Sequence, residues 1–183
     1  MSIVQALRQW LFRFGRDEQL PIVLTQRRIF IVPTRVGLLF VVVLIVMLLG
    51  AINYDLSLGH ALVFLLAGLG IVAMVHTFRN LVALRLTPGR VDPVFAGDLA
   101  RFPLSIENPR TYPRRSLDLS FSNESSTKID VPGNDRASAI LTSKTAKRGR
   151  HAPGRITLTT RYPLGLFRAW SYPHPLFSCV VYP

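Results

Sequence analysis

Between Arg35 and Arg79 the chain reads VGLLFVVVLIVMLLGAINYDLSLGHALVFLLAGLGIVAMVHTF. Asp55 is the one formal charge in this stretch when histidine is counted as neutral. It separates an uncharged segment of nineteen residues, Val36–Tyr54, from one of twenty-three residues, Leu56–Phe78. A bilayer core about 30 Å thick is crossed by roughly 20 apolar residues in a helix rising about 1.5 Å per residue. Each segment is long enough to cross a membrane, and we predict a two-helix transmembrane hairpin.

The hairpin, residues 36–79, divides the rest of the chain into parts that are all basic. The 183 residues include 22 Lys and Arg against 10 Asp and Glu, a formal net charge of +12. Six basic and two acidic residues precede the hairpin, and fifteen basic and seven acidic residues follow it from residue 84 onward. We predict an amphipathic interfacial helix over 1–16, a basic linker over 17–35 and one small domain over 80–183.

Residues 1–16 show the 3.6-residue period of an amphipathic helix, with Trp, Phe and Leu on one side and Arg largely on the other. Such a helix suits the membrane–water interface, where arginines meet anionic headgroups. We therefore predict interfacial anchors at Trp10, Arg8 and Arg13, and at Arg35 and Arg79 where the hairpin begins and ends. The alternative is a helix that packs against the chain's own domain.

Positive charge flanks the hairpin on both sides and is missing from its turn. Three arginines precede it closely and three follow it, whereas Asn53–Asp55 contains no Lys or Arg. The positive-inside rule then predicts that both termini, and the domain after the hairpin, are cytoplasmic. The flanking arginines are Arg27, Arg28, Arg35, Arg79, Arg85 and Arg90.

Three further features of the hairpin lead to predictions: an N-cap, a ridge of small residues and two histidines. Thr34 is positioned to act as the N-cap of the first helix. Ala67, Gly70 and Ala73 form a ridge of small residues that we expect to face the first helix, because small residues let helix backbones approach closely in lipid. An ionisable residue inside a membrane is by default a candidate for a proton or ion path. His60 and His76, however, lie near the ends of the second segment, with no ionisable partner deep in the core.

The hydrophobic period changes from 3.6 to 2 after Asn80. Apolar and polar residues alternate over 82–87, 101–106, 117–122 and 155–159, and turn residues such as Pro132-Gly133-Asn134 separate these runs. Six to eight short strands over about 100 residues predict an antiparallel β-sandwich. The predicted fold class is therefore a membrane α-hairpin of two transmembrane helices followed by an all-β, antiparallel sandwich domain.

The sequence offers no recognisable catalytic or cofactor motif. It contains no phosphate-binding loop, no His-Glu-x-x-His, no Gly-x-Ser-x-Gly and no cluster of metal ligands. Cys179 is the single cysteine, which excludes an intrachain disulfide and a multi-cysteine zinc site. Its alternating apolar surroundings indicate a small buried residue rather than a reactive thiol. We predict no enzymatic activity, no cofactor and no metal.

The densest run of charge is Lys144–His151, which reads KTAKRGRH. Lys144, Lys147, Arg148 and Arg150 are the candidate contacts to lipid phosphates or to an acidic partner. The alternative is a solvated loop between two strands. Nucleic acid is disfavoured as a partner, because the run lacks the interleaved aromatic residues of a single-strand binder.

The most distinctive run is Thr160–Trp170, which reads TRYPLGLFRAW. Pro163 and Gly165 occupy the second and fourth positions of a predicted type I turn. We interpret the run as a turn that enters a core strand, with Leu166, Arg168 and Trp170 on one face. Arg161 and Arg168 then lie at the surface or pair internally, and the alternative is a ligand site.

This run, followed by the terminal sequence CVVYP, resembles the central signature of a bacterial membrane family known as domain of unknown function 58. Asn53-Tyr54, Phe95–Asp98 and Lys147–His151 match further features of the family in the same order. The resemblance covers about residues 35–183. It implies a cytoplasmic β domain on a hairpin in the bacterial inner membrane. Because genes of this family often neighbour those of MoxR-type AAA+ ATPases, it also implies a role beside such an ATPase.

Typical members of that family continue past the Val-Tyr-Pro sequence with a region often related to von Willebrand factor A domains. The resemblance therefore transfers no function of that region, including metal-dependent adhesion, and we expect a truncated member or the anchor part of a split one. We predict a non-enzymatic membrane scaffold or adaptor whose partners are membrane lipid, other membrane proteins and an AAA+ ATPase. The alternatives are a component of a cell-envelope enzyme or of a transport assembly.

Overall fold

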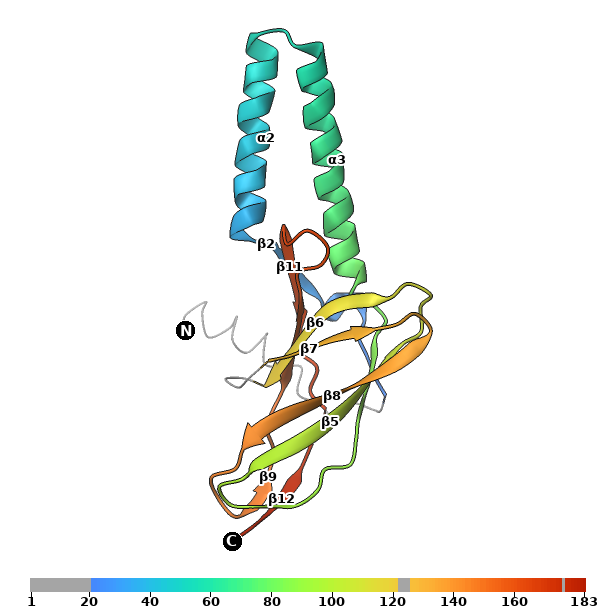
Figure 1. The fold of residues 1–183 in the computed structure, drawn as a ribbon, viewed down its shortest axis with the longest axis vertical. Coiled ribbons are helices and arrows are strands. Elements are labelled where there is room, and N and C mark those ends of the chain that lie inside the picture. Colours follow the sequence, from blue (N-terminus) through green and yellow to red (C-terminus); the bar gives the residue numbers. More distant parts are fainter. Residues whose placement is uncertain (1–20, 122–125, 176) are drawn as a thin grey trace, which may run out of the picture.

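The structure is a computed structural model that describes residues 21–121, 126–175 and 177–183. Two helices, α2 over Arg35–Asn53 and α3 over Ser57–Arg79, form a hairpin that projects from one end of a β domain (Figure 1). This arrangement confirms the predicted fold class, and the helix ends differ from the predicted ones by one residue. The helix predicted over 1–16, with Trp10, Arg8 and Arg13, lies outside the described residues.

Both helices are long and apolar enough to cross a membrane. Their apolar side chains are mostly exposed: Leu39 and Val46 of α2 are each 63% exposed, and Leu65 of α3 is 71% exposed. A core helix of a soluble domain would instead be buried by the rest of its chain. The exposed apolar surface runs along the whole hairpin, far beyond what a water-soluble surface normally carries.

The two helices contact each other through small residues, of which Gly70 belongs to the ridge predicted to face the first helix. A Cβ atom on Gly70 would lie 3.2 Å from Cε1 of Phe40 on α2, and one on Gly59 would lie 3.0 Å from Cβ of Ala51. Ala73 is 2% exposed and Ala67 is half-buried. The prediction that the ridge faces the first helix is thus confirmed at Gly70, where the phenyl ring of Phe40 takes the place that a larger residue would fill.

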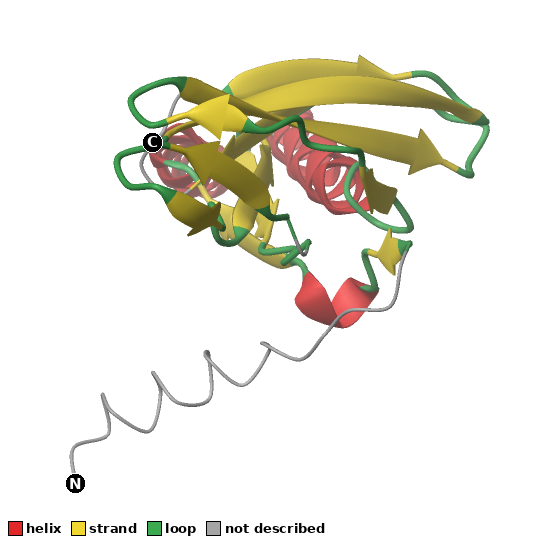
Figure 2. Cartoon of the chain, turned by 90° about the horizontal axis from the view of Figure 1, so that it is seen from below, coloured by secondary structure: helices red, strands yellow, loops and turns green. Residues whose placement is uncertain are grey.

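The β domain consists of three sheets, and Figure 2 shows it from the end opposite the hairpin, with the strands in yellow. In the described part of the chain, the strand orders are β1-β3-β5-β8, β2-β11-β10-β6-β7 and β4-β12-β9. All neighbouring strands are antiparallel except β12 and β4. The strands are β1 (Ile22–Val23), β2 (Phe30–Pro33), β3 (Arg85–Pro88), β4 (Val94–Phe95), β5 (Leu99–Asn108), β6 (Arg114–Phe121), β7 (Thr127–Val131), β8 (Asp135–Lys144), β9 (Gly149–His151), β10 (Ile156–Thr160), β11 (Phe167–Ser171) and β12 (Cys179–Tyr182).

The core lies between the two larger sheets and is built from the apolar positions of the period-2 pattern. Phe102 of β5 packs edge-on against Phe121 of β6, with ring centroids 5.5 Å apart, and lies 5.3 Å from the ring of Phe177. Along these strands every second residue is buried, because successive side chains of a strand point to opposite sides of the sheet. The fully buried members include Leu86, Leu104, Ile106, Leu117, Leu119, Ile156 and Leu158.

The prediction of a linker over 17–35 is wrong for its described part, which belongs to the β domain. β1 pairs with β3, β2 pairs with β11, and a short 3₁₀ helix over Gln26–Arg28 joins the two strands. Ile22 and Leu24 are only 2% and 1% exposed in the core. Strands of two and four residues are too short to show a recognisable alternation. The hairpin is therefore an insertion into the β domain, which begins before α2 and resumes after α3.

The start of α2 is bonded to the turn before β11, residues 161–166, which we call the joint loop. The Thr34 hydroxyl accepts a hydrogen bond from the Gly37 amide (3.1 Å), which confirms the predicted N-cap, and itself donates to the Gly165 carbonyl (2.7 Å). The Thr34 amide donates to the Leu166 carbonyl (2.8 Å). The bonds from Thr34 to Gly165 and Leu166 join residues more than 130 positions apart.

The joint loop is not the predicted type I turn. The peptide bond between Tyr162 and Pro163 is cis, and the Gly165 amide, at φ +71°, donates to the Arg161 carbonyl at 2.9 Å. In a type I turn over 162–165 the Gly165 amide would bond the Tyr162 carbonyl, whereas here it bonds the carbonyl one residue earlier and closes a five-residue turn. In the strand that follows, Ala169 and Ser171 point inward, so Arg168 and Trp170 lie on the outer side, with the guanidinium 5.7 Å from the indole centroid.

Gly37 and Gly50 of α2 provide a matched pair of substitutions that tests the joint. A Cβ atom on Gly37 would overlap the carbonyl oxygen of Leu166, whereas one on Gly50 would meet nothing within 4 Å. We expect Gly37→Ala to lower the free energy of unfolding by about 1–3 kcal/mol, the usual cost of overpacking against a fixed group. Gly50→Ala should be neutral or slightly stabilising, because alanine favours the helix. Thermal unfolding in detergent measures both, and equal effects would contradict the described contact.

Candidate functional site

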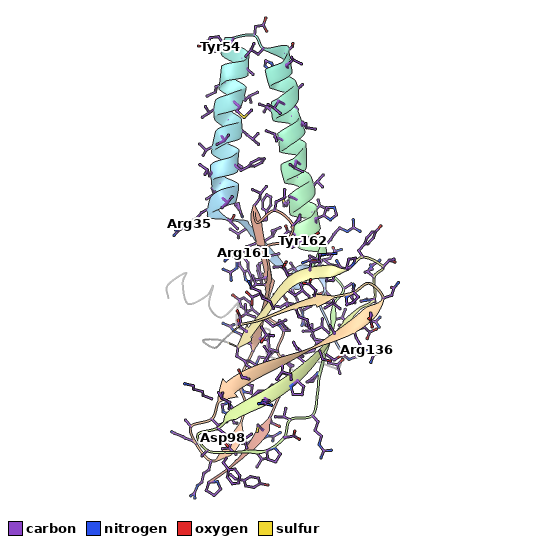
Figure 3. The ribbon with its side chains drawn as sticks, in the orientation of Figure 1. Arg35, Tyr54, Asp98, Arg136, Arg161 and Tyr162 are labelled. Atoms are coloured by element: carbon purple, nitrogen blue, oxygen red, sulfur yellow. The ribbon has the colours of Figure 1, made fainter. Side chains whose placement is uncertain are left out.

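The residues singled out in the sequence lie at opposite ends of the β domain. Arg35 and Arg79 are at the end that carries the hairpin, as the first residue of α2 and the last residue of α3. The basic run Lys144–His151 is at the other end. Figure 3 labels Arg35 beside the start of α2, and Asp98 at the far end of the domain. The two groups therefore cannot act on one small ligand.

The position of the basic run follows from its backbone contacts with the loop that holds Asp98. The Thr145 hydroxyl donates to the Asp98 carbonyl (2.7 Å), and the Gly97 amide donates to the Thr145 carbonyl (2.9 Å). These bonds fix the turn between β8 and β9 beside Asp98, at the end most remote from the hairpin (Figure 3). Sequence reasoning recognised the charge of this run but had no signal for which end of the domain it occupies.

The strand that ends the basic run places its charge beside exposed apolar side chains. β9 pairs with β12, so Arg150 lies opposite Val180, and the Arg150 guanidinium donates to the Ser178 hydroxyl at 3.3 Å. On the other side of β12, the rings of Phe95 and Tyr182 are 6.1 Å apart. Phe95, Val180 and Tyr182 are 62%, 54% and 49% exposed.

We call this group the distal face. It combines aromatic and aliphatic side chains with cations, which is the composition of the centre and rim of many protein–protein interfaces. Exposed apolar residues that gather in this way mark contact sites more often than scattered ones. The distal face consists of Phe95, Lys144, Lys147, Arg148, Arg150, Val180 and Tyr182, all of which are exposed.

At the hairpin end, Asn80 joins the end of α3 to the five-stranded sheet. Its side chain is 4% exposed and donates to the Arg115 carbonyl (2.8 Å) and to the Thr160 hydroxyl (2.8 Å). The Arg115 amide donates back to its Oδ1 at 3.2 Å. The two donors and the acceptor of this buried amide all have partners. The amide therefore fixes β6, which holds Arg115, and β10, which holds Thr160, relative to the end of α3.

Arg114 is a buried cation placed at the carboxyl end of α3. It is 7% exposed, and its guanidinium donates to the carbonyls of Arg79 and Val82 (3.1 Å for the latter) and to Oδ1 of Asn108 (3.2 Å). The last carbonyls of a helix have no partner within the helix and carry the negative end of its dipole. Arg114 therefore caps α3 with a full positive charge.

The partners that the structure gives Arg114 are all neutral oxygens, so its charge is not balanced by an ion pair among the described residues. Burial, with smaller contributions from the charges of Arg79 and Arg110, lowers the pKa of the Arg114 guanidinium. An arginine nevertheless stays protonated at neutral pH. Sequence reasoning missed this residue, because an Arg-Arg pair beside a proline reads as a solvated turn.

Arg35 and Arg79, the two predicted anchor arginines within the described residues, are exposed at the hairpin base. The guanidinium of Arg79 lies 5.7 Å from the ring centroid of Tyr112, and Arg35 points away from the hairpin (Figure 3). Arg161 of the joint loop is exposed at the same end (Figure 3). The base of the hairpin therefore carries positive charge where its apolar surface begins.

The groups able to carry chemistry do not assemble into a reactive site among the described residues. Ser143 and His151 lie 3.1 Å apart between Oγ and Nε2, but Ser143 is 4% exposed. Cys179 is 1% exposed and its thiol lies 3.3 Å from the Asp92 carbonyl, which confirms the prediction of a small buried residue. No three described His, Cys, Asp or Glu residues are grouped to hold a metal ion.

His60 and His76 stand sixteen residues apart on α3, which corresponds to about 24 Å along a helix. His60 Nδ1 lies 2.8 Å from the Leu56 carbonyl at the start of the helix, and His76 is exposed near its end. A proton cannot pass directly between groups at this separation, so the two histidines alone do not form a relay through the hairpin.

No protein-family model matches the chain, and no curated protein sequence matches it. The resemblance to domain of unknown function 58, which rests on the runs quoted above, stays a prediction.

Arg114 and its exposed neighbour Arg115 allow a controlled test of the helix cap. We expect Arg114→Ala to lower the free energy of unfolding by about 2–3 kcal/mol, because hydrogen bonds from a charged donor and the interaction with the helix end are lost together. Arg115→Ala removes an equal charge but no side-chain bond that the structure shows, and should change stability by less than about 0.5 kcal/mol. Chemical unfolding in detergent, followed by near-ultraviolet circular dichroism, distinguishes the two. A loss of the same size in both variants would rule out a capping role.

Proposed function

We propose that the chain is a non-enzymatic, membrane-anchored scaffold that presents its distal face to a protein partner. The observation that carries this proposal is the separation of two surfaces: an exposed apolar hairpin at one end and a basic, aromatic-containing face at the other (Figure 1). The hairpin surface is suited to lipid, and the distal face is suited to a protein. The β domain between them has a packed core and acts as a spacer.

In this proposal the hairpin crosses a bacterial inner membrane twice and the β domain lies in the cytoplasm. The arginines at the hairpin base and the turn without Lys or Arg support this orientation through the positive-inside rule. Because the hairpin is inserted into the β domain, one domain is held by both helices at once. The distal face then points away from the bilayer, since it is at the opposite end of the domain.

The placement of the basic run favours a partner protein over lipid of the membrane that holds the hairpin. Anionic headgroups attract cations only within about a Debye length, roughly 8–10 Å at physiological salt, and the run lies at the end of the domain remote from the hairpin (Figure 3). The cations of the distal face would complement an acidic surface, while Phe95 and Tyr182 supply apolar area. An AAA+ ATPase is the partner that the family resemblance suggests.

The proposed contact is tested by reversing charge on the distal face. The triple variant Lys147→Glu, Arg148→Glu, Arg150→Glu should reduce capture of an AAA+ ATPase from detergent-solubilised membranes by at least about tenfold, because electrostatic complementarity governs association and like charges repel. The wild-type capture should also weaken as salt rises. Quantitative immunoblotting or mass spectrometry of the captured fraction measures the effect.

A control variant changes the same net charge elsewhere on the β domain. Arg110→Glu, Lys128→Glu and Arg136→Glu are exposed positions outside the distal face, and this variant should retain capture. If both triple variants lose capture equally, binding follows net charge alone. If neither loses it, the distal face is not the contact surface.

A further inference from the structure

The joint loop occupies the mouth of the hairpin. It comes from the β domain, enters β11, and reaches the level at which the two helices begin and end (Figure 1). The carbonyl of Leu166 packs directly against the backbone of Gly37. Gly37 is two residues past the first residue of α2, or about 3 Å along the helix axis. The loop is thus held at the level where the apolar surface of the hairpin starts.

The side chains that the loop exposes there are not those of an ordinary solvated turn. Leu164 is 50% exposed, Tyr162 is 37% exposed, and Arg161 beside them is also exposed. A tyrosine combines an apolar ring with a polar tip, and an arginine can extend its charge outward from an apolar surface. Together they have the amphipathic composition found at membrane–water interfaces.

We infer that the joint loop is a second membrane contact of the β domain. Leu164 and the ring of Tyr162 insert into the interfacial region of the bilayer, and the guanidinium of Arg161 binds lipid phosphate. This inference rests on the proposed membrane placement of the hairpin and adds to it a lipid-binding element that does not belong to either helix.

Lipid is the occupant that the surroundings of the loop require. Val36 at the start of α2 is 60% exposed and Val75 in the last turns of α3 is 47% exposed, so apolar helix surface flanks the loop on both sides. If lipid covers those helix surfaces, it reaches the loop at the same depth. A soluble partner would have to enter the headgroup region to contact Leu164.

The contact would fix the tilt of the β domain relative to the bilayer. The helix ends are bonded to the β domain through Thr34, Asn80 and Arg114, so the hairpin and the domain tilt together in the bilayer. An inserted loop between the helices adds a further point of attachment that limits this tilt.

The inference is tested with the full chain reconstituted in vesicles of phosphatidylethanolamine and phosphatidylglycerol. In a Cys179→Ala background, an environment-sensitive fluorophore is attached at Leu164→Cys, with Leu65→Cys in the middle of α3 and Val180→Cys on the distal face as references. Lipid carrying a nitroxide close to its headgroup quenches a fluorophore in the interfacial region, and lipid carrying the nitroxide deep in its acyl chain quenches the fluorophore at position 65. We expect several-fold stronger quenching at position 164 than at position 180, with a blue-shifted emission.

The references separate failure of this inference from failure of the proposed function. Quenching at 65 but not at 164 would overturn the lipid contact of the loop and leave the membrane anchor in place. Quenching at neither position would overturn both. A fluorophore at 164 that is shielded from lipid quencher and from aqueous iodide alike would show that protein covers the loop, which also overturns the inference. Arg161→Cys gives a second reporting position should Leu164→Cys not fold.

Discussion

The junction between the hairpin and the β domain has to satisfy backbone groups that neither part can satisfy alone. The first amides of α2 and the last carbonyls of α3 have no partners within their helices. Thr34 bonds the Gly37 amide at the start of α2, and Arg114 bonds the Arg79 carbonyl at the end of α3. Both arrangements depend on residues distant in sequence, since Thr34 is itself held by the joint loop and Arg114 belongs to β6.

This junction explains how one chain can combine two surfaces with opposite requirements. The helices expose apolar side chains along their length, while the β domain buries its apolar side chains between two sheets. Because β1 and β2 precede α2, the domain is attached through both helices, and Asn80 bonds the second helix to the sheet. Such an attachment limits the motion of the domain, which suits the proposed role as a scaffold whose distal face keeps a defined direction.

The sequence predicted those features that depend on local pattern. The hairpin was predicted from two long stretches without charge, and the sandwich from the period-2 alternation after Asn80. The N-cap was predicted from the chemistry of Thr34, and the burial of Cys179 from its apolar neighbours. Each of these needs only the identity of nearby residues.

The features that depend on distant contacts were not predictable in the same way. β1 and β2 are too short to alternate visibly, so their residues read as a linker. Arg114 has the sequence context of a surface turn, yet folding places it under the end of α3. The basic run was recognised, but its distance from the hairpin arises from the sheet topology, and the proposal of a protein partner in place of lipid rests on this distance.

The proposed topology, in which the hairpin crosses a membrane, places its turn and its β domain on opposite sides. In a Cys179→Ala background, Tyr54→Cys in the turn and Leu99→Cys in the β domain are both more than half exposed, at 73% and 54% for the native residues. A membrane-impermeant thiol reagent added to intact spheroplasts should label Tyr54→Cys, and should label Leu99→Cys only after permeabilisation. Labelling of both positions from the outside, or of neither before permeabilisation, would contradict the account.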